Sequence, residues 1–397
     1  MKPFRGNTRM VALCEFKPYY FRDNIEKCVS PPFDSISGPV ESELKSFPFN
    51  ITHLTLPEGE SKGSVLISQW IDLGILKRNE EAGMILIRQQ TVIRGSMLDR
   101  YGIISLVDIN PEDGMVQPHE KTFPSKVSER VKVLNDADAQ LEPIFLAVNN
   151  ELFDQKLRSL SSKLKPWLKF TDTEGVKYEI SFIPLNESQD ISGILMKDVA
   201  IVADGHHRLA ASKQIARSSN EVSSAFWSSI MAYTTSMNSD SLLVDGIHRV
   251  LKCKIEEDKL AKLKSVCRVL PEDATNLQEE DIIILSQGEK LAIDREKADR
   301  SELSAISDIH LLEDSLLRDI LGLSEEDLDK MIYYTHDLGE CKRLVNSGQA
   351  SMAFIMPPWK KDRLYSLILD IGYLPQKSTY FFPKVCSGIV MNINRTI

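Results

Sequence analysis

The chain has 397 residues, a mass of 44.9 kDa, 42% hydrophobic residues and 26% charged residues, which is the composition of a globular protein with about two domains. This excludes a disordered chain, a collagen and a small disulfide-stapled scaffold. Lys and Arg total 48 and Asp and Glu total 57, so the net charge is −9. An acidic protein is poorly suited to non-specific binding of duplex DNA, because that binding depends on neutralising phosphates.

Other broad signals point to a cytoplasmic protein. No apolar run reaches the length of about 18 residues that a transmembrane helix needs, so no membrane partner is expected. The first ten residues have no apolar core, so no signal peptide is expected. The six cysteines form no CxxC pair and have no metal-ligand spacing, which predicts reduced thiols.

In the first half of the chain, hydrophobic periodicity predicts short strands and helices after an irregular start over residues 1–50. A helix that begins at the capping residue Ser125 has Glu129 and Arg130 near its start. The predicted strands are 52–56, 84–93, 102–109, 143–148 and 177–182; the predicted helices are 64–76, 125–139 and 152–164; the predicted loops are 94–100 and 116–124.

The second half opens with the segment 198–203, whose continuous apolar run at 199–203 predicts a strand covered on both faces. A turn follows at Asp204 and Gly205. Beyond it the sequence predicts helices to about 217, over 255–268, over most of 300–335 and over 360–371, strands at 228–233 and 351–357, and an extended segment at 375–390. This mixture predicts an α+β (mixed α/β) fold. The expected domains are 1–250 and a mostly helical 251–397, whose C-terminal segment returns to the first.

The sharpest chemical signal is Val-Ala-Asp-Gly-His-His-Arg at residues 202–208. It lies where a buried strand becomes a helix, and a helix N-terminus offers unpaired N–H groups and a positive dipole end. Gly205 allows a ligand to approach the backbone closely. His206, His207 and Arg208 add side-chain donors for a phosphate. The segment therefore predicts an anion site.

Other roles for the same residues stay open. Asp204 is suited to holding a metal, orienting a histidine or capping the helix. A His-His-Asp metal site is a weaker reading, because adjacent histidines rarely point at one ion. The plain structural alternative is a capping aspartate followed by surface histidines.

A second cluster, Gln-Pro-His-Glu-Lys-Thr at residues 117–122, places an acid, a base and a hydroxyl on one loop. Glu120 is a candidate general base for a substrate hydroxyl, with His119 beside it. Lys121 is a candidate for neutralising phosphate charge, and Thr122 is a further donor. The alternative is a solvated polar loop. The cluster is not an HExxH motif, so it does not indicate zinc hydrolysis.

Weaker candidates lie elsewhere in the chain. Lys377, Ser378 and Thr379 are phosphate-compatible donors, although no Walker A loop precedes them. His248 and Arg249 follow an apolar stretch and read equally as a surface pair. The segment 31–34, Pro-Pro-Phe-Asp, reads as a turn or as a means of placing Asp34 in a site. No GxSxG or GxGxxG motif occurs.

Together these segments resemble the family called domain of unknown function 1015, often labelled ParB-related. The matching pieces, in order over nearly the whole chain, are 31–34, the region 88–102, 118–122, 143–145, 203–208 and 375–381. The Asp-Gly-His-His-Arg segment is also similar to the nucleotide-phosphate box of the ParB/sulfiredoxin superfamily, which includes free serine kinases. The resemblance implies a ParB/sulfiredoxin-like nucleotide-binding core with helical and C-terminal additions.

The same resemblance implies a phosphotransferase that makes O-phosphoserine from free L-serine, or acts on a similar hydroxyl compound. It implies Mg²⁺ and a phosphate donor, with ATP, ADP and pyrophosphate all open. The catalytic residues would be Glu120, His119 and Asp204; the phosphate-binding residues Gly205, His206, His207, Arg208, Lys121 and Thr122; and the substrate-binding residues Lys377, Ser378, Thr379, His248 and Arg249. No protein-held metal ligand is assigned.

Two other function classes stay open. A ParB-like, nucleotide-switched DNA-binding protein would need a basic recognition helix, whereas residues 255–335 carry acidic runs. A nucleotide sensor would bind the donor and leave it unchanged. Sulfiredoxin-like redox chemistry is disfavoured, because Gly205 stands where that box would have a cysteine. The oligomeric state is not predicted.

Overall fold

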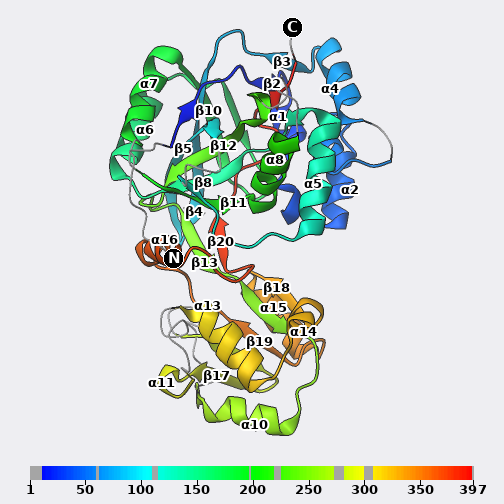
Figure 1. The fold of residues 1–397 in the computed structure, drawn as a ribbon, viewed down its shortest axis with the longest axis vertical. Coiled ribbons are helices and arrows are strands. Elements are labelled where there is room, and N and C mark those ends of the chain that lie inside the picture. The colour runs from blue at the N-terminus through cyan, green and yellow to red at the C-terminus, as the bar shows by residue number, and fades with distance from the viewer. Residues whose placement is uncertain are drawn as a thin grey trace. The chain divides into compact units, whose positions relative to one another are not determined.

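The computed structural model describes residues 11–59, 62–109, 115–195, 198–218, 225–271, 281–298 and 307–395. The chain forms two compact units, each described by itself below (Figure 1). Unit 1 consists of Met1–Leu242 and Pro383–Ile397, and unit 2 of Leu243–Phe382. The division falls a few residues before the boundary expected at 250, and the last residues of the chain belong to unit 1.

Unit 1 is built on a nine-stranded mixed sheet. The neighbours β6 and β11 are parallel, as are β8 and β12, and the other pairs are antiparallel. In sheet order the strands are β6 (Val116–Gln117), β11 (Ala200–Asp204), β8 (Ile144–Val148), β12 (Ser229–Ser236), β5 (Ser96–Asp108), β4 (Gly83–Ile93), β10 (Lys177–Pro184) and β9 (Leu168–Thr171), with β1 (Leu13–Cys14) also pairing with β5. The mixed α/β class expected from the sequence is confirmed.

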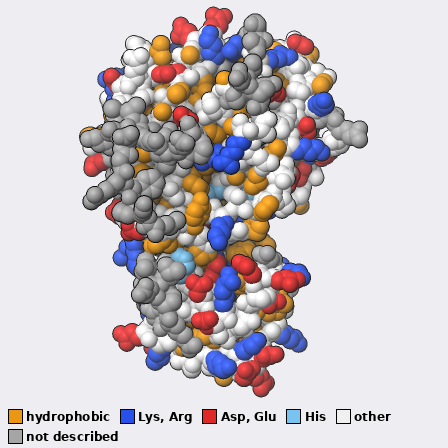
Figure 2. Space-filling model, viewed as in Figure 1, with side chains coloured by type: hydrophobic (Ala, Val, Ile, Leu, Met, Phe, Trp, Pro, Cys, Tyr) orange, Lys and Arg blue, Asp and Glu red, His pale blue; other side chains and the backbone are white. Residues whose placement is uncertain are grey.

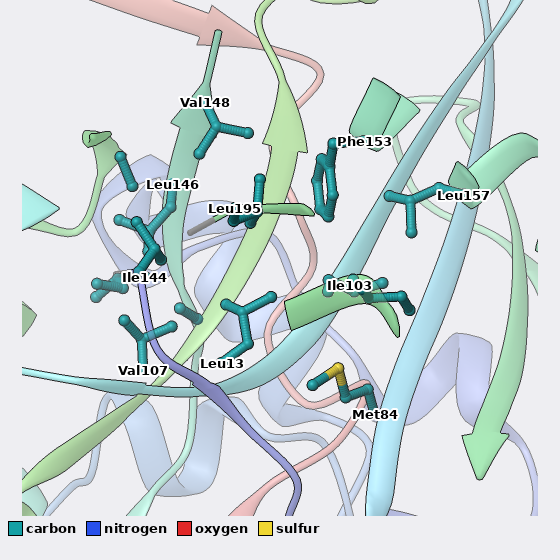
Figure 3. Packing of buried hydrophobic residues seen from close by; sticks show 14 of the residues in the cluster. Leu13, Met84, Ile103, Val107, Ile144, Leu146, Val148, Phe153, Leu157 and Leu195 are labelled. Atoms are coloured by element: carbon teal, nitrogen blue, oxygen red, sulfur yellow. The ribbon is translucent and has the colours of Figure 1, made fainter. Parts of the chain in front are cut away.

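Two pairs of helices cover this sheet, one on each side of it in Figure 1. Helices α6 (Glu151–Lys163) and α7 (Leu185–Ile194) pack on a cluster of buried side chains from the central strands. Figure 3 shows Phe153 and Leu157 of α6 directed at Ile103, Leu146 and Val148. On the other side α5 (Pro124–Ala137) packs on α8 (His206–Ser218) through a smaller apolar cluster that includes Trp227.

Short elements complete unit 1. Strand β2 (Tyr19–Phe21) pairs with β3 (Leu76–Arg78), and β7 (Ala139–Gln140) pairs with β21 (Asn392–Ile393) near the end of the chain. The remaining helices are α1 (Ile25–Cys28), the 3-10 turn η1 (Phe33–Ser35), α2 (Gly38–Lys45), α3 (Thr52–Thr55) and α4 (Gly63–Asp72).

Three local predictions were wrong for identifiable reasons. Residues 52–56 form no strand, because the Asn50 side chain bonds the N–H and hydroxyl of Thr52 and starts the short helix α3. The loop expected at 94–100 is a two-residue hairpin turn: Arg94 and Gly95 both have positive φ, and the β4–β5 pairing resumes at once. Helix α5 begins at Pro124, which is favourable at a first helical position, so Ser125 is not its cap.

Unit 2 contains a six-stranded antiparallel sheet, of which the sequence predicted only the strand at 351–357, because the strands are short. In sheet order they are β15 (Cys267–Val269), β17 (Glu289–Ile293), β16 (Ile283–Ser286), β19 (Met352–Ile355), β14 (His248–Leu251) and β18 (Ile332–Thr335), and β13 (Leu243–Gly246) pairs separately with β20 (Thr379–Phe382). The helices are α10 (Glu257–Ser265), α11 (Arg295–Ala298), α13 (Asp308–His310), the π-helix η2 (Leu311–Ile320), α14 (Glu325–Met331), α15 (Leu338–Asn346) and α16 (Lys361–Ile371). Residues 300–306 of the predicted helical stretch lie outside the described residues.

None of the helices in the described part of the chain is long and apolar enough to cross a membrane. On the face shown in Figure 2, basic and acidic side chains of the described residues alternate over both units, and no continuous basic area is visible among them.

Candidate anion-binding and catalytic site

Two of the sequence clusters meet at one edge of the unit 1 sheet. Strands β6 and β11 are parallel neighbours, with Val116 opposite Ala200. Their carboxyl ends therefore open at the same edge, where ligands commonly bind in α/β sheets. The loop at residues 118–123 follows β6, and the Asp204–Gly205 turn follows β11. Parallel pairing thus brings together two segments that are more than eighty residues apart in the sequence.

Hydrogen bonds then fix the loop against the first turn of α8. The N–H of His119 donates to Nε2 of His206 at 3.4 Å, and the N–H of Phe123 donates to Nε2 of His207 at 3.2 Å. The rings of Phe123 and His207 lie parallel, with centroids 6.2 Å apart. Because a backbone N–H can only donate, both Nε2 atoms are unprotonated acceptors. The loop backbone and the two α8 histidines are therefore in direct contact.

Gly205 is required at the turn for two reasons. Its φ is +90°, which disfavours any residue with a Cβ atom. A Cβ atom there would also lie 3.1 Å from the Arg208 guanidinium and 3.0 Å from the Ile144 side chain. The carbonyl of Gly205 accepts the N–H of Leu209 and so starts α8. The first-turn N–H groups of the helix consequently face the end of β11.

Asp204 joins two cations at this turn. Its Oδ2 accepts a hydrogen bond from Nη2 of Arg208 at 2.7 Å, and its Oδ1 accepts one from Nζ of Lys384 at 2.6 Å. The side chains of Asp204, Arg208 and Lys384 are 13%, 7% and 16% exposed, so solvent screens the pairs only weakly. Arg208 also donates to the carbonyl of Pro143, which ties α8 to the start of β8.

Further carboxylates surround Arg208. Burial by itself lowers the pKa of this guanidinium, but Glu142, Asp204 and Asp34 together raise it above its ordinary value. Glu142 also accepts the N–H of Phe33, and the Phe33 ring lies 4.0 Å from the Arg130 guanidinium. The Pro-Pro-Phe-Asp turn is therefore anchored beside the site. The sequence had favoured a purely structural turn for it.

His119 and Glu120 occupy the loop side of the site. His119 is fully buried, and its ring centroid is 4.8 Å from that of His206. Burial, followed by the influence of His206, lowers the pKa of His119 to about 3, so the ring is neutral near pH 7. Oε1 of Glu120 lies 3.9 Å from Nε2 of His119. The side chain of Glu120 is 15% exposed, so it keeps access to solvent.

The other two predicted donors on this loop are Lys121 and Thr122. Lys121 is exposed, and Thr122 is half-buried at an open groove of about 500 Å³ between α5 and α8. Lys121 and Thr122 follow Glu120 by one and two residues. The groove beside Thr122 is lined mainly by residues of α5 and α8. Their assignment to phosphate binding stays a prediction.

The five predicted substrate-binding residues all belong to unit 2. Within that unit they are brought together, because Nη2 of Arg249 donates to the carbonyl of Gln376 at 3.2 Å and to Glu313 at 2.9 Å. His248 is buried, Nδ1 accepts the N–H of Met356, and burial lowers its pKa to about 4. Ser378 is buried as well, while Lys377 is half-buried. Their role in substrate binding stays a prediction.

The described residues do not form a protein-held metal site. No group of three or more His, Cys, Asp or Glu side chains in that part of the chain is arranged to hold an ion. Asp204 does not fit Mg²⁺ in this arrangement, because both of its oxygens accept hydrogen bonds from cations. Mg²⁺ commonly binds through one or two carboxylates and the phosphates of a substrate. The residues present therefore supply no Mg²⁺ cage of their own.

Sequence reasoning missed two residues next to this site. Lys384 lies in the predicted extended segment 375–390 and was given no role, although its ammonium donates a hydrogen bond to Asp204. Arg100 was placed in a loop, yet it is fully buried between the rings of Phe145 and Tyr233, 5.0 and 5.5 Å from their centroids. No local signal marked Arg100, which stands between Asp99 and Tyr101. Nothing local identified Lys384, because its partner is 180 positions away.

The low pKa of His119 predicts a stability effect. Between pH 6.5 and 3 the unfolded chain binds a proton at this position and the folded protein does not, so the free energy of unfolding falls as the pH falls through this window. Between pH 6 and pH 5, the free energy of unfolding should fall by about 1 kcal/mol less in His119→Gln than in the wild type. Urea unfolding of both proteins at the two pH values measures this, and an identical loss in both would contradict it.

Comparison with known proteins gives one family match and several distant structures. A family model described as "Protein of unknown function (DUF1015)" matches residues 16–315. No curated protein matches the chain. A conserved hypothetical protein from Pyrococcus furiosus is 13% identical with a TM-score of 0.38, covering 72% of this chain and 95% of its own.

Two further structures have named proteins. Free serine kinase in complex with AMP is 12% identical with a TM-score of 0.37, covering 72% of this chain and 92% of its own. SbnI from Staphylococcus aureus, with a C-terminal truncation, is 9% identical with a TM-score of 0.39, covering 72% and 85%. Similarities this distant carry no argument about activity, which must come from the residues of the site.

Proposed function

The chain belongs to the DUF1015 family, and we propose that this member is a small-molecule kinase that phosphorylates the hydroxyl of free L-serine or a similar compound. One observation supports the proposal. The hydrogen bonds from the backbone of His119 and Phe123 to the two α8 histidines hold the loop that contains Glu120 against the first turn of α8. A candidate base and a candidate anion site, recognised separately in the sequence, thereby become one site.

The proposed chemistry uses these groups as follows. Glu120 accepts the proton of the acceptor hydroxyl while the hydroxyl oxygen attacks the terminal phosphorus of the donor. A new P–O bond forms, the bond to the remaining phosphate breaks, and the leaving phosphate retains the electron pair. The first-turn N–H groups of α8, together with His206 and His207, would bind the phosphate oxygens.

The buried residues of the site act by positioning. His119 is neutral and holds the loop to α8, so it would orient Glu120 rather than exchange protons near pH 7. Arg208 fixes the turn through Asp204 and Pro143. Unit 1 would be the ParB/sulfiredoxin-like catalytic core, with unit 2 as the addition that bears the predicted acceptor-binding residues. Since the described residues do not fit a protein-held Mg²⁺, no step is assigned to the metal.

A donor-by-acceptor screen tests the proposal. Purified full-length protein is incubated with ATP, ADP, CTP or pyrophosphate and with L-serine and Mg²⁺, and O-phosphoserine is measured by mass spectrometry. We expect product with at least one donor. Binding of a donor without product from serine or other small hydroxyl compounds would instead support a nucleotide sensor. A salt-sensitive gel shift with duplex DNA would support the DNA-binding alternative.

A further inference from the structure

The C-terminal return of the chain crosses the face of the unit 1 sheet opposite α6 and α7. We call residues 383–387 the return strap. The carbonyl of Pro383 accepts from Arg100, and the carbonyl of Lys384 accepts from Gln89 at 2.9 Å and Tyr178 at 3.2 Å. At the other end, Ser387 and Ser30 exchange backbone hydrogen bonds, and the Ser387 hydroxyl donates to Glu142. The backbone of the strap is thus fixed on both sides of Lys384.

This anchoring leaves the Lys384 side chain directed at the end of β11. Its ammonium lies 2.6 Å from Asp204, one residue before the glycine that starts α8. Glu174 is a second carboxylate in its surroundings, since Lys384 lowers the pKa of Glu174 against the stronger, opposing influence of burial. A lysine ammonium is a compact charge on a flexible stem and exchanges readily between acceptors.

The other cationic candidates of unit 1 are less suited to a phosphate. The Nε2 atoms of His206 and His207 already accept backbone hydrogen bonds from the loop. Arg208 is buried, and its Nη1 and Nη2 donate to Pro143 and Asp204. Lys121 is exposed on the loop. Of these residues, Lys384 alone combines a full positive charge, a flexible side chain and a position beside the α8 first turn.

We infer that Lys384 is the phosphate-binding cation of this site and that Asp204 holds it in place when no anion is bound. A phosphate of the donor would then accept the hydrogen bond of the Lys384 ammonium in place of Asp204. Asp204 would keep its hydrogen bond from Arg208. The inference rests on the proposed function for the identity of the ligand. It also explains why the chain returns to unit 1, since the return strap delivers one charge to a site formed otherwise by residues 119–208.

Binding of pyrophosphate and ADP, measured by isothermal titration calorimetry on the full chain, tests the inference without requiring turnover. We expect Lys384→Gln to weaken binding by about tenfold or more, and to reduce the dependence of the affinity on salt. Lys384→Arg should retain part of the affinity, because it keeps the charge. Lys156→Gln, which removes an ammonium from a surface pair with Asp190, is the matched control and should bind like the wild type. Thermal unfolding verifies that each variant is folded.

The outcomes separate this inference from the proposed function. Wild-type affinity in Lys384→Gln overturns the inference and leaves the kinase proposal standing. Weakened binding in Lys384→Gln, together with no product in the donor-by-acceptor screen, supports the inference and counts against the kinase. If the wild-type protein binds neither pyrophosphate nor ADP, the inference is overturned, and ATP or CTP must then bind for the kinase proposal to survive.

Discussion

Glu120→Gln is expected to lower the turnover of the phosphorylation reaction by about 10²–10⁴-fold, the usual contribution of a general base. The amide has nearly the same shape as the carboxylate but cannot accept the hydroxyl proton. Donor affinity should change little, because the α8 N–H groups and Lys384 are untouched. Steady-state rates and calorimetric donor binding, measured on the same preparation, give the two quantities separately.

Glu129→Gln, on helix α5, is a matched control for this substitution. Glu129 is 61% exposed on α5 and pairs with Arg130, so Glu129→Gln removes a carboxylate of equal size outside the site. It should retain wild-type turnover. Full activity in Glu120→Gln would show that another group accepts the proton; the exposed Asp34, close enough to Arg208 to raise its pKa, would then be the next carboxylate to replace.

Asp204→Ala is expected to lower the free energy of unfolding by about 3 kcal/mol, because it leaves two largely buried cations without their shared carboxylate. The side chains of Arg208 and Lys384 are 7% and 16% exposed, so water compensates them poorly. Glu142 and Asp34 stand near Arg208 and Glu174 near Lys384, which keeps the expected loss at the lower end of the range for a broken buried pair. Chemical denaturation at pH 7 measures it.

Asp190→Ala provides the comparison for that stability measurement. Asp190 is 73% exposed and pairs with Lys156 on the surface, where an ion pair contributes about 0–1 kcal/mol. Equal losses of unfolding free energy in the two variants would mean that the Asp204 carboxylate does not stabilise the turn through Arg208 and Lys384. A large loss of unfolding free energy in Asp204→Ala, together with weaker donor binding, would show that Asp204 contributes both to stability and to anion binding.

Much of unit 1 was predictable because its signals are local. The apolar run at 199–203 predicted a buried strand, and β11 is buried on both faces over Ala200–Val202. The glycine after Asp204 predicted the strand-to-helix turn, which has the expected positive φ. Hydrophobic periodicity could not predict which strands pair with each other. Parallel contact between β6 and β11, which unites the two clusters, depends on strands of two and five residues.

The chemical roles of individual residues were harder to predict than their positions. The sequence predicted His206 and His207 as side-chain donors for a phosphate but did not predict that backbone N–H groups of the loop bond to their Nε2 atoms. It assigned Arg208 to phosphate binding, which stays a prediction, and in the structure the guanidinium donates to Pro143 and Asp204. The contact with Pro143, 65 positions away, is one that composition and spacing do not encode.

The return strap also constrains how the protein is made. A ribosome adds roughly 5–20 residues per second, so the N-terminal part of unit 1 emerges on the order of ten seconds before the strap that follows unit 2. During that interval Arg100 lacks the Pro383 carbonyl and Asp204 lacks the Lys384 ammonium. Until the strap is made, Arg100 has its partner Gln89 and Asp204 its partner Arg208. A chain that ends before residue 383 would therefore lack part of the site.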